Sequence, residues 1–226
     1  MFSIISPIDS NRLQQFKATY EAYKALGEYV YEFIMPTREY DKVKAFFDAN
    51  NIQAKLIPYE HSIGYNPSKA LNIGYKNVTY DNIIVTSPEV MPKTNVLQQL
   101  SELIGQNVLC QVWEQNEDKS IGMSLVNSTF RSSHPGYYFL AMFTKDSIAK
   151  INGWDEEFMK GYAFEDDDFG HRFNRAGLKF VMRDDIQAIH QWHPRSETIP
   201  NGWNINKDRL RYNDACGTVW ATKGVQ

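Results

Sequence analysis

Residues 152–158 read NGWDEEF and residues 161–177 read GYAFEDDDFGHRFNRAG. The apolar spacing of the second segment predicts a helix over residues 165–176 that ends at Gly177. Four consecutive acids fill its first turn, where the helix dipole favours each negative charge by roughly 0.3–1 kcal/mol. That effect accounts for one or two acids, but four adjacent carboxylates repel one another. At least one should therefore have a raised pKa, or a metal or acceptor partner.

Outward from this helix, short apolar strands alternate with amphipathic helices, which is typical of βαβ units. The segment from residue 114 to 133 is polar and is predicted to be a long loop. The segment after residue 200 shows no clear periodicity. Strands are predicted at residues 2–8, 29–35 (ending at Pro36), 54–58, 82–86, 107–113, 137–143 and 180–189, and helices at residues 11–26, 41–50, 68–75, 94–104, 147–151 and 165–176.

Composition and charge count against several classes of protein. The formal net charge is −3 and no Lys/Arg-rich run occurs, which counts against an electrostatic grip on nucleic acid. Cys110 and Cys216 lie far apart with no CxxC spacing, so we expect two buried free thiols in a reducing compartment. The N-terminus lacks the pattern of a signal peptide, and no window has the roughly 18–20 apolar residues of a membrane span.

The acidic stretch resembles the acceptor-side motif of GT-A glycosyltransferases, as in the family 2 enzymes and the related galactosyltransferase domain. That motif has an apolar strand, an Asn-Gly-Trp-Asp-Glu-type turn, a glycine, and then Glu-Asp-x-Asp followed by an apolar residue and Arg. The elements occur here in the same order, from the strand at 137–143 to Leu178. The resemblance implies an α/β fold of the GT-A type, a Rossmann-like nucleotide-diphospho-sugar transferase with a mixed central sheet.

The resemblance also assigns roles. Asp166 is the expected catalytic base of an inverting transfer, and Glu165 is expected to hold the acceptor. Trp154 is expected to stack on a sugar, and Tyr162 to join these residues in binding the acceptor. Arg172 is expected to form an i,i+4 ion pair with Asp168 that braces the helix.

A metal site is expected where Ser87-Pro88-Glu89 follows the strand at 82–86. In the resembling enzymes this place holds Asp-x-Asp, whose last acid binds Mn²⁺ or Mg²⁺ on the donor diphosphate. Here Glu89 takes the place of that last acid, and Ser87 takes the place of the first Asp. A glutamate oxygen is a suitable ligand for a hard divalent cation. A histidine beyond the acidic helix completes the metal site in those enzymes, and both His190 and His193 are eligible.

The donor is expected near the helix at 68–75, whose sequence resembles the helix before the Asp-x-Asp strand in family 2 enzymes. Ser68 is a reasonable N-cap, and a helix N-terminus with a basic residue suits a diphosphate. Ligands also gather at the carboxyl ends of strands in open α/β sheets. The expected donor-binding residues are Ser6, Pro7, Thr37, Arg38, Asn66, Lys69, Asn72, Ser87 and Arg195.

Together these features predict one domain over residues 1–226: a nucleotide-sugar-binding half to residue 100, an acceptor-binding half over 101–200, and a C-terminal tail over 201–226. The predicted function is hexosyltransferase-type transfer from a nucleotide-diphosphate sugar, with UDP favoured, to a glycan or other hydroxyl. The predicted location is the cytoplasm, either free or at the periphery of a membrane or assembly.

Three alternatives remain open. One is a viral enzyme of the same fold that glycosylates a DNA base, against which the negative charge counts. Another is a non-catalytic module that binds a nucleotide sugar or carbohydrate, against which the intact Glu165-Asp166 pair counts. The third is a nucleotidyltransferase, but the glycine-rich loop expected after its first strand is missing.

Overall fold

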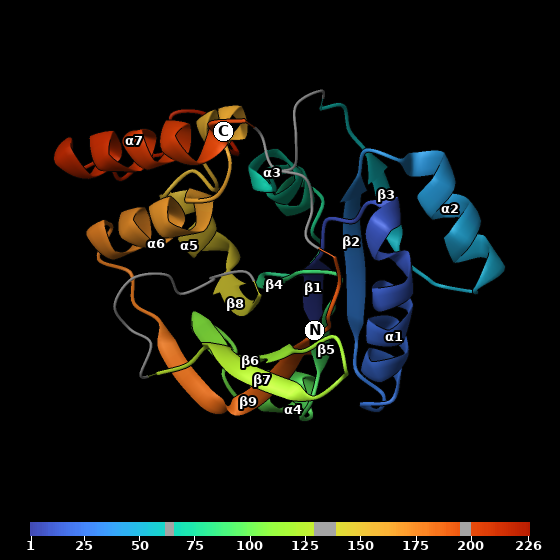
Figure 1. The fold of residues 1–226 in the computed structure, drawn as a ribbon. Coiled ribbons are helices and arrows are strands. Elements are labelled where there is room, and N and C mark those ends of the chain that lie inside the picture. Colours follow the sequence, from blue (N-terminus) through green and yellow to red (C-terminus); the bar gives the residue numbers. More distant parts are fainter. Residues whose placement is uncertain (62–65, 129–138, 195–199) are drawn as a thin grey trace.

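The computed structural model describes residues 1–61, 66–128, 139–194 and 200–226. Within them nine strands form one sheet in the order β3-β2-β1-β4-β8-β6-β9-β5, with β7 paired to β6 (Figure 1). The first four strands of that order run parallel, whereas β8 is antiparallel to both β4 and β6. The mixed sheet is therefore as predicted. The strands are β1 (Phe2–Ile5), β2 (Tyr31–Thr37), β3 (Lys55–Pro58), β4 (Asn82–Thr86), β5 (Val90–Pro92), β6 (Val108–Gln115), β7 (Ile121–Val126), β8 (Leu140–Thr144) and β9 (Val181–His190).

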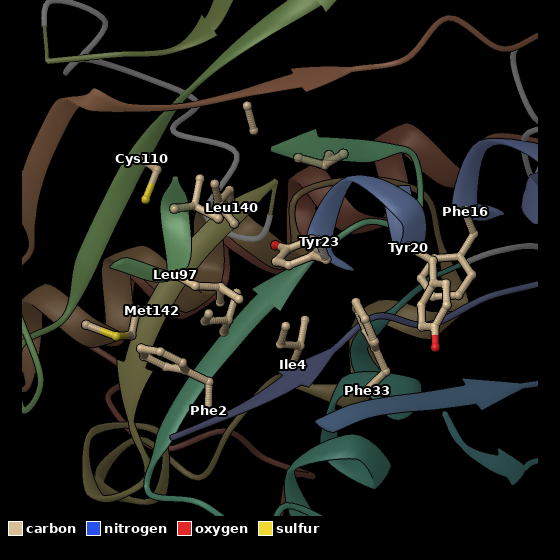
Figure 2. Packing of buried hydrophobic residues seen from close by; sticks show 14 of the residues in the cluster. Phe2, Ile4, Phe16, Tyr20, Tyr23, Phe33, Leu97, Cys110, Leu140 and Met142 are labelled. Carbon is tan, nitrogen blue, oxygen red and sulfur yellow. The ribbon is translucent and has the colours of Figure 1, made fainter. Parts of the chain in front are cut away.

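Helices cover both faces of the sheet (Figure 1). Those that pack on it, such as α1 and α2, bury one apolar side. The core on the face of α1 contains Phe16, Tyr20 and Tyr23, which pack on Ile4 and Phe33 of the sheet (Figure 2). The α-helices are α1 (Leu13–Lys24), α2 (Tyr40–Ala49), α3 (Ser68–Lys76), α4 (Val96–Ser101), α5 (Lys145–Lys150), α6 (Glu165–Arg175) and α7 (Gly202–Ala215), and short 3-10 turns span Ser10–Arg12 and Glu156–Lys160.

A column of aromatic rings anchors α6 to the opposite face. Trp154 stacks on Phe169 with ring centroids 4.7 Å apart, and Phe173 stacks on Phe180 at 4.2 Å. Phe143 of β8 meets the edges of these rings. All five rings except that of Phe180 are fully buried, so the position of α6 is set by the core.

A buried ion pair ties α6 to its surroundings. Arg172 Nε donates to Asp168 Oδ2 at 2.6 Å, and both side chains are completely buried. Arg172 Nη1 also donates to the carbonyls of Ile151 and Gly153, at 2.8 and 2.9 Å. Asn213 of α7 donates to the other Asp168 oxygen at 2.6 Å. The expected i,i+4 pair is therefore present, and it joins α6 to the 151–153 turn and to α7, which lies beside it (Figure 1).

Several expectations were wrong in detail. The predicted loop over 114–133 contains β7, which pairs with β6 in a hairpin, while residues 129–133 lie outside the described residues. The segment after residue 200 forms α7 and packs on α6. Pro36 lies within β2 rather than after it, and Cys216 is exposed rather than buried. The N-cap position of α3 is Pro67, and Asn66 rather than Ser68 accepts a hydrogen bond there, from the Ser68 amide at 3.0 Å.

A search of the described residues for a helix long and apolar enough to cross a membrane found none.

The buried ion pair gives a stability prediction. Replacing Arg172 by Met leaves the Asp168 carboxylate buried without its cation, which should lower the free energy of unfolding by about 3–5 kcal/mol. Arg183→Met removes the half-exposed pair with Asp185 and should cost less than about 1 kcal/mol. Chemical denaturation measures both. An equal loss in the two variants would contradict the central role of Arg172.

Candidate active site

A cavity of about 760 Å³ opens at the carboxyl ends of β1 and β4. It is the place where ligands of open α/β sheets bind, because loops leaving adjacent parallel strands diverge there. The residues that line it come from both halves of the chain: Pro7, Asp9, Asn11, Arg12, Arg38, Pro67, Leu71, Thr86, Ser87, Pro88, Glu89, Phe139, Tyr162, Ala163, Glu165, Asp166, His190 and His193.

The pairing of β5 with β9 brings Glu89 next to the two histidines. Val90 lies opposite His190 in an antiparallel ladder of three residue pairs. Gln191 extends this contact, since its amide N–H donates to the Glu89 carbonyl at 2.9 Å and its side chain donates to Thr19 Oγ1 at 3.0 Å. A short ladder therefore sets the separation between one carboxylate and two imidazoles that are distant in sequence.

The three side chains have the geometry of a cation site. Nε2 of His190 and Nε2 of His193 each lie 3.4 Å from Glu89 Oε1, and the ligand atoms are all within 4.8 Å of one another. His193 Nδ1 lies 2.8 Å from the Pro194 carbonyl, which can only accept. Nδ1 therefore carries the proton, and in neutral His193 the lone pair of Nε2 faces the carboxylate. Two facing acceptors need a proton or a metal between them.

The charge on Glu89 is maintained despite its burial. Only 8% of the residue is exposed, and burial raises the pKa of its carboxyl. Hydrogen bonds with His190 and His193, and the charge of Arg12, outweigh burial and hold that pKa well below its usual range. Arg12 Nε lies 3.7 Å from Glu89 Oε2, an oxygen with no hydrogen bond within the described part of the chain. This buried oxygen therefore lies beside the positive charge of Arg12.

The loop before α6 aims the acidic residues into the cavity. Ala163 and Phe164 both adopt left-handed backbone conformations, with φ of 60° and 68°, which residues other than glycine rarely adopt. Asn206 of α7 holds this loop by donating to the carbonyls of Ala163 and Phe158, at 2.7 and 2.9 Å. Gly161 is required there because a Cβ would lie 2.3 Å from Asn206 Oδ1.

Glu165 and Asp166 are held differently. Asn66 Nδ2 donates to Glu165 Oε2 at 3.0 Å, and both residues are buried. Because Asn66 Oδ1 accepts from the Ser68 amide, the orientation of the Asn66 amide is fixed and Glu165 must accept. Asp166 is half-buried, and its Oδ1 accepts the amide N–H of Asp167 at 2.9 Å.

The raised pKa expected among the four acids falls on Asp167. Burial, and then the negative charge of Asp166, raise the pKa of Asp167 from 3.8 to about 7, while His171 opposes the shift. Asp167 does not line the cavity, so this shift belongs to the packing of α6 rather than to the cavity itself.

Sequence reasoning missed the residues that follow β1. Asp9 is nearly buried in the cavity wall, and both its oxygens accept from Arg38: Oδ1 from the backbone N–H at 3.2 Å and Oδ2 from Nε at 2.8 Å. Asn11 and Arg12 line the same wall. The signal was the position of Asp9 directly after the first predicted strand, where ligands of such sheets bind.

The cavity gathers most of the residues singled out in the sequence. Asn66 holds Glu165, and the expected residues on the cavity wall are Pro7, Arg38, Ser87, Glu89, Tyr162, Glu165, Asp166, His190 and His193. Ser6 and Thr37 are fully buried and are not among the residues that line the cavity. Arg195 lies outside the described residues.

Three expected contacts are wrong as stated. Trp154 is fully buried in the aromatic column, so its ring offers no face to a sugar. Asn72 is also buried, where it accepts from the Trp154 amide at 3.0 Å and donates to the Trp154 carbonyl at 2.8 Å. Lys69 does not line the cavity, and its Nζ donates to the Glu60 carbonyl at 2.9 Å.

Comparison with known proteins shows what part of the chain is similar to a known family. A family model described as the N-terminal domain of galactosyltransferase matches residues 123–193, a span that includes the acidic turn of α6 and both cavity histidines. No curated protein matches the chain.

Solved structures share the fold over nearly the whole chain. TarS from S. aureus matches with a TM-score of 0.67 at 12% identity, covering 94% of this chain and 39% of that one. TarS residues 1–349 in complex with UDP match at 0.66 and 12%, covering 99% and 67%. The mannosyltransferase PcManGT from Pyrobaculum calidifontis, in complex with GDP-Man and Mn²⁺, matches at 0.59 and 12%, covering 95% and 64%. The chain thus has the GT-A fold expected from its sequence, and it spans from 39% to 67% of these proteins.

Asp167 gives a prediction for pH dependence. A carboxyl whose pKa is raised from 3.8 to about 7 by folding favours the folded state at low pH, and that advantage disappears as the pH rises through 7. Asp167→Asn should therefore raise the free energy of unfolding at pH 8 by about 2–4 kcal/mol and change it little at pH 4.

Denaturation curves at the two pH values measure the effect. Asp118→Asn serves as the control, because Asp118 is exposed and its pKa is lowered by Ser120, so this variant should gain no stability at pH 8. A loss of stability in Asp167→Asn at pH 8 would contradict the raised pKa.

Proposed function

We propose that the chain is a glycosyltransferase that moves a sugar from a nucleotide-diphosphate sugar to an acceptor hydroxyl, with inversion at the anomeric carbon. The observation that carries this proposal is one cavity lined by two distinct functional groups. They are the cation-type cluster of Glu89, His190 and His193, and the Glu165-Asp166 pair. A single displacement needs this division, since the leaving diphosphate gains negative charge while the acceptor loses a proton.

Asp166 is the proposed general base. It is half-buried in the cavity wall in the first turn of α6, directly after the loop that Asn206 holds. In the reaction its carboxylate takes the proton of the acceptor hydroxyl, whose oxygen bonds to the anomeric carbon as the bond from that carbon to the diphosphate breaks. Glu165, held by Asn66, accepts a hydrogen bond from the acceptor and orients it.

Glu89, His190 and His193 are the proposed ligands of the divalent cation, Mn²⁺ or Mg²⁺, on the leaving diphosphate. The two imidazoles favour Mn²⁺, because Mg²⁺ prefers oxygen ligands. A bound divalent cation would neutralise charge on the departing diphosphate. Arg12 and Arg38 line the same cavity and add positive charge near the phosphates. UDP is the favoured nucleotide, since the TarS structures include complexes with UDP and with UDP-GlcNAc.

Metal-dependent nucleotide binding is the first test. UDP with Mn²⁺ should raise the melting temperature of the wild type, because a ligand that binds only the folded state stabilises it. Glu89→Gln and His193→Ala should lose the part of the rise that requires Mn²⁺. His171→Ala is the matched control, since His171 lies on the surface of α6 and contacts Asp214. A rise that is independent of Mn²⁺ would remove the metal from the site, and no rise with UDP, GDP or CDP would favour a binding module or another fold member.

The second test addresses the base. Asp166→Asn should lower the rate of UDP release from UDP-glucose or UDP-N-acetylglucosamine by about 10²–10⁴-fold while leaving Mn²⁺–UDP binding intact. Asp167→Asn, a change of the same kind one residue away, should keep the activity. Product NMR should show inverted configuration. A retained configuration, or equal activity in wild type and Asp166→Asn, would contradict the role of Asp166.

A further inference from the structure

An exposed tryptophan lies beside the turn that leads into α6, on a helix that the sequence did not predict. Trp203 lies in the first turn of α7 and is 49% exposed. Its ring meets the ring of Phe164 at an angle of 60°, with centroids 4.5 Å apart, and Phe164 directly precedes Glu165. Tyr162, which is 36% exposed, lines the cavity two residues earlier. The exposed ring of Trp203 and the cavity-lining ring of Tyr162 therefore both belong to the surroundings of the turn that leads into Glu165 and Asp166.

Trp203 is held rigidly relative to the proposed base. The amide of Tyr162 donates to the Gly202 carbonyl at 3.0 Å, next to Trp203. Asn206, one turn further along α7, donates to the Ala163 carbonyl at 2.7 Å. A Cβ on Gly161 would lie 2.5 Å from the Gly202 carbonyl, which shows how closely the loop and α7 approach. The start of α7 and the turn that carries Asp166 thus form one unit.

We propose that Trp203, together with Tyr162, is a stacking platform for a pyranose ring of the acceptor, so that the acceptor is a saccharide. This inference rests on the proposed function and adds the class of acceptor. An exposed indole offers an apolar face to the C–H side of a sugar ring. Asn201 and Asn204 flank Trp203 and are exposed, so their amides are available to sugar hydroxyls.

The charges near this platform favour a neutral ring over a nucleic-acid base. The first turn of α6 carries four acids next to Phe164, and a phosphate backbone entering here would meet Glu165 and Asp166 directly. A neutral pyranose meets no such repulsion, and its hydroxyl protons are suited to carboxylate acceptors. Trp203 therefore occupies the role that the sequence assigned to Trp154, but from α7.

Trp220 offers a matched control. It is 48% exposed, nearly the same as Trp203, but it lies beyond the C-terminus of α7, whereas Trp203 lies in the first turn of that helix and contacts Phe164. The experiment titrates Trp203→Ala, Trp203→Phe, Trp220→Ala and wild type with methyl glycosides of glucose, galactose, mannose and N-acetylglucosamine, in the presence of saturating UDP and Mn²⁺. Tryptophan fluorescence and ligand-observed NMR report binding. The melting temperature with UDP and Mn²⁺ reports the donor site independently.

At least one glycoside should bind wild type and Trp220→Ala with equal affinity, Trp203→Phe slightly less well, and Trp203→Ala about tenfold more weakly, while all four keep the response to UDP. Equal affinity in Trp203→Ala overturns the platform, as does binding of duplex DNA in place of every glycoside. Self-association in solution that is lost in Trp203→Ala would assign the ring to a contact between copies, which also overturns it. A wild type that responds to UDP but binds no glycoside overturns the saccharide inference alone, whereas one that does not respond to UDP contradicts the proposed function.

Discussion

The buried pair of Asp168 and Arg172 is the interaction on which the acidic half of the site depends. Neither charge reaches solvent, so each must find its partners inside the protein. Arg172 meets this need with two carbonyls of the 151–153 turn, and Asp168 with Asn213 of α7. The ion pair therefore fixes three separate segments at once. The left-handed turn that presents Asp166, and the ring of Trp203 beyond it, are both attached to this frame.

The parts of the fold that could be predicted are those whose apolar pattern is set by burial on the sheet. The strand at 82–86 was predicted to the residue, since its centre is buried on both faces. By contrast, β7 is a short apolar segment between polar residues, and among the described residues it pairs with β6 alone. Ile121 and Met123 remain exposed, so burial imposes no regular apolar pattern on it. Helix α7 was missed because its contacts with the rest of the chain rest largely on Asn206, Arg209 and Asn213, which leave no apolar period.

The candidate site also has parts that the sequence could predict and parts that it could not. Motif order predicted that Glu89, His190 and His193 would share a cavity with Glu165 and Asp166, and the structure brings these five side chains to one cavity. Their roles remain predictions. Motif order could not tell which aromatic faces solvent, because Trp154 follows a turn and its burial depends on Phe169, one turn into a later helix. Nor could it show that Asp9 would face Arg38, since that contact exists only once β1 and β2 are paired.

The ladder of β5 and β9 also constrains the order in which the protein matures. It joins Val90 to His190 across one hundred residues of chain, through only three residue pairs. Contacts so distant in sequence form late, because the chain between them must be ordered first. During synthesis, the sheet formed by β1 to β4 has every residue it needs long before the second half of the cluster emerges from the ribosome. The nascent chain would thus hold a nucleotide-side framework without either histidine of the cluster, and the centre would close only in the last steps of folding.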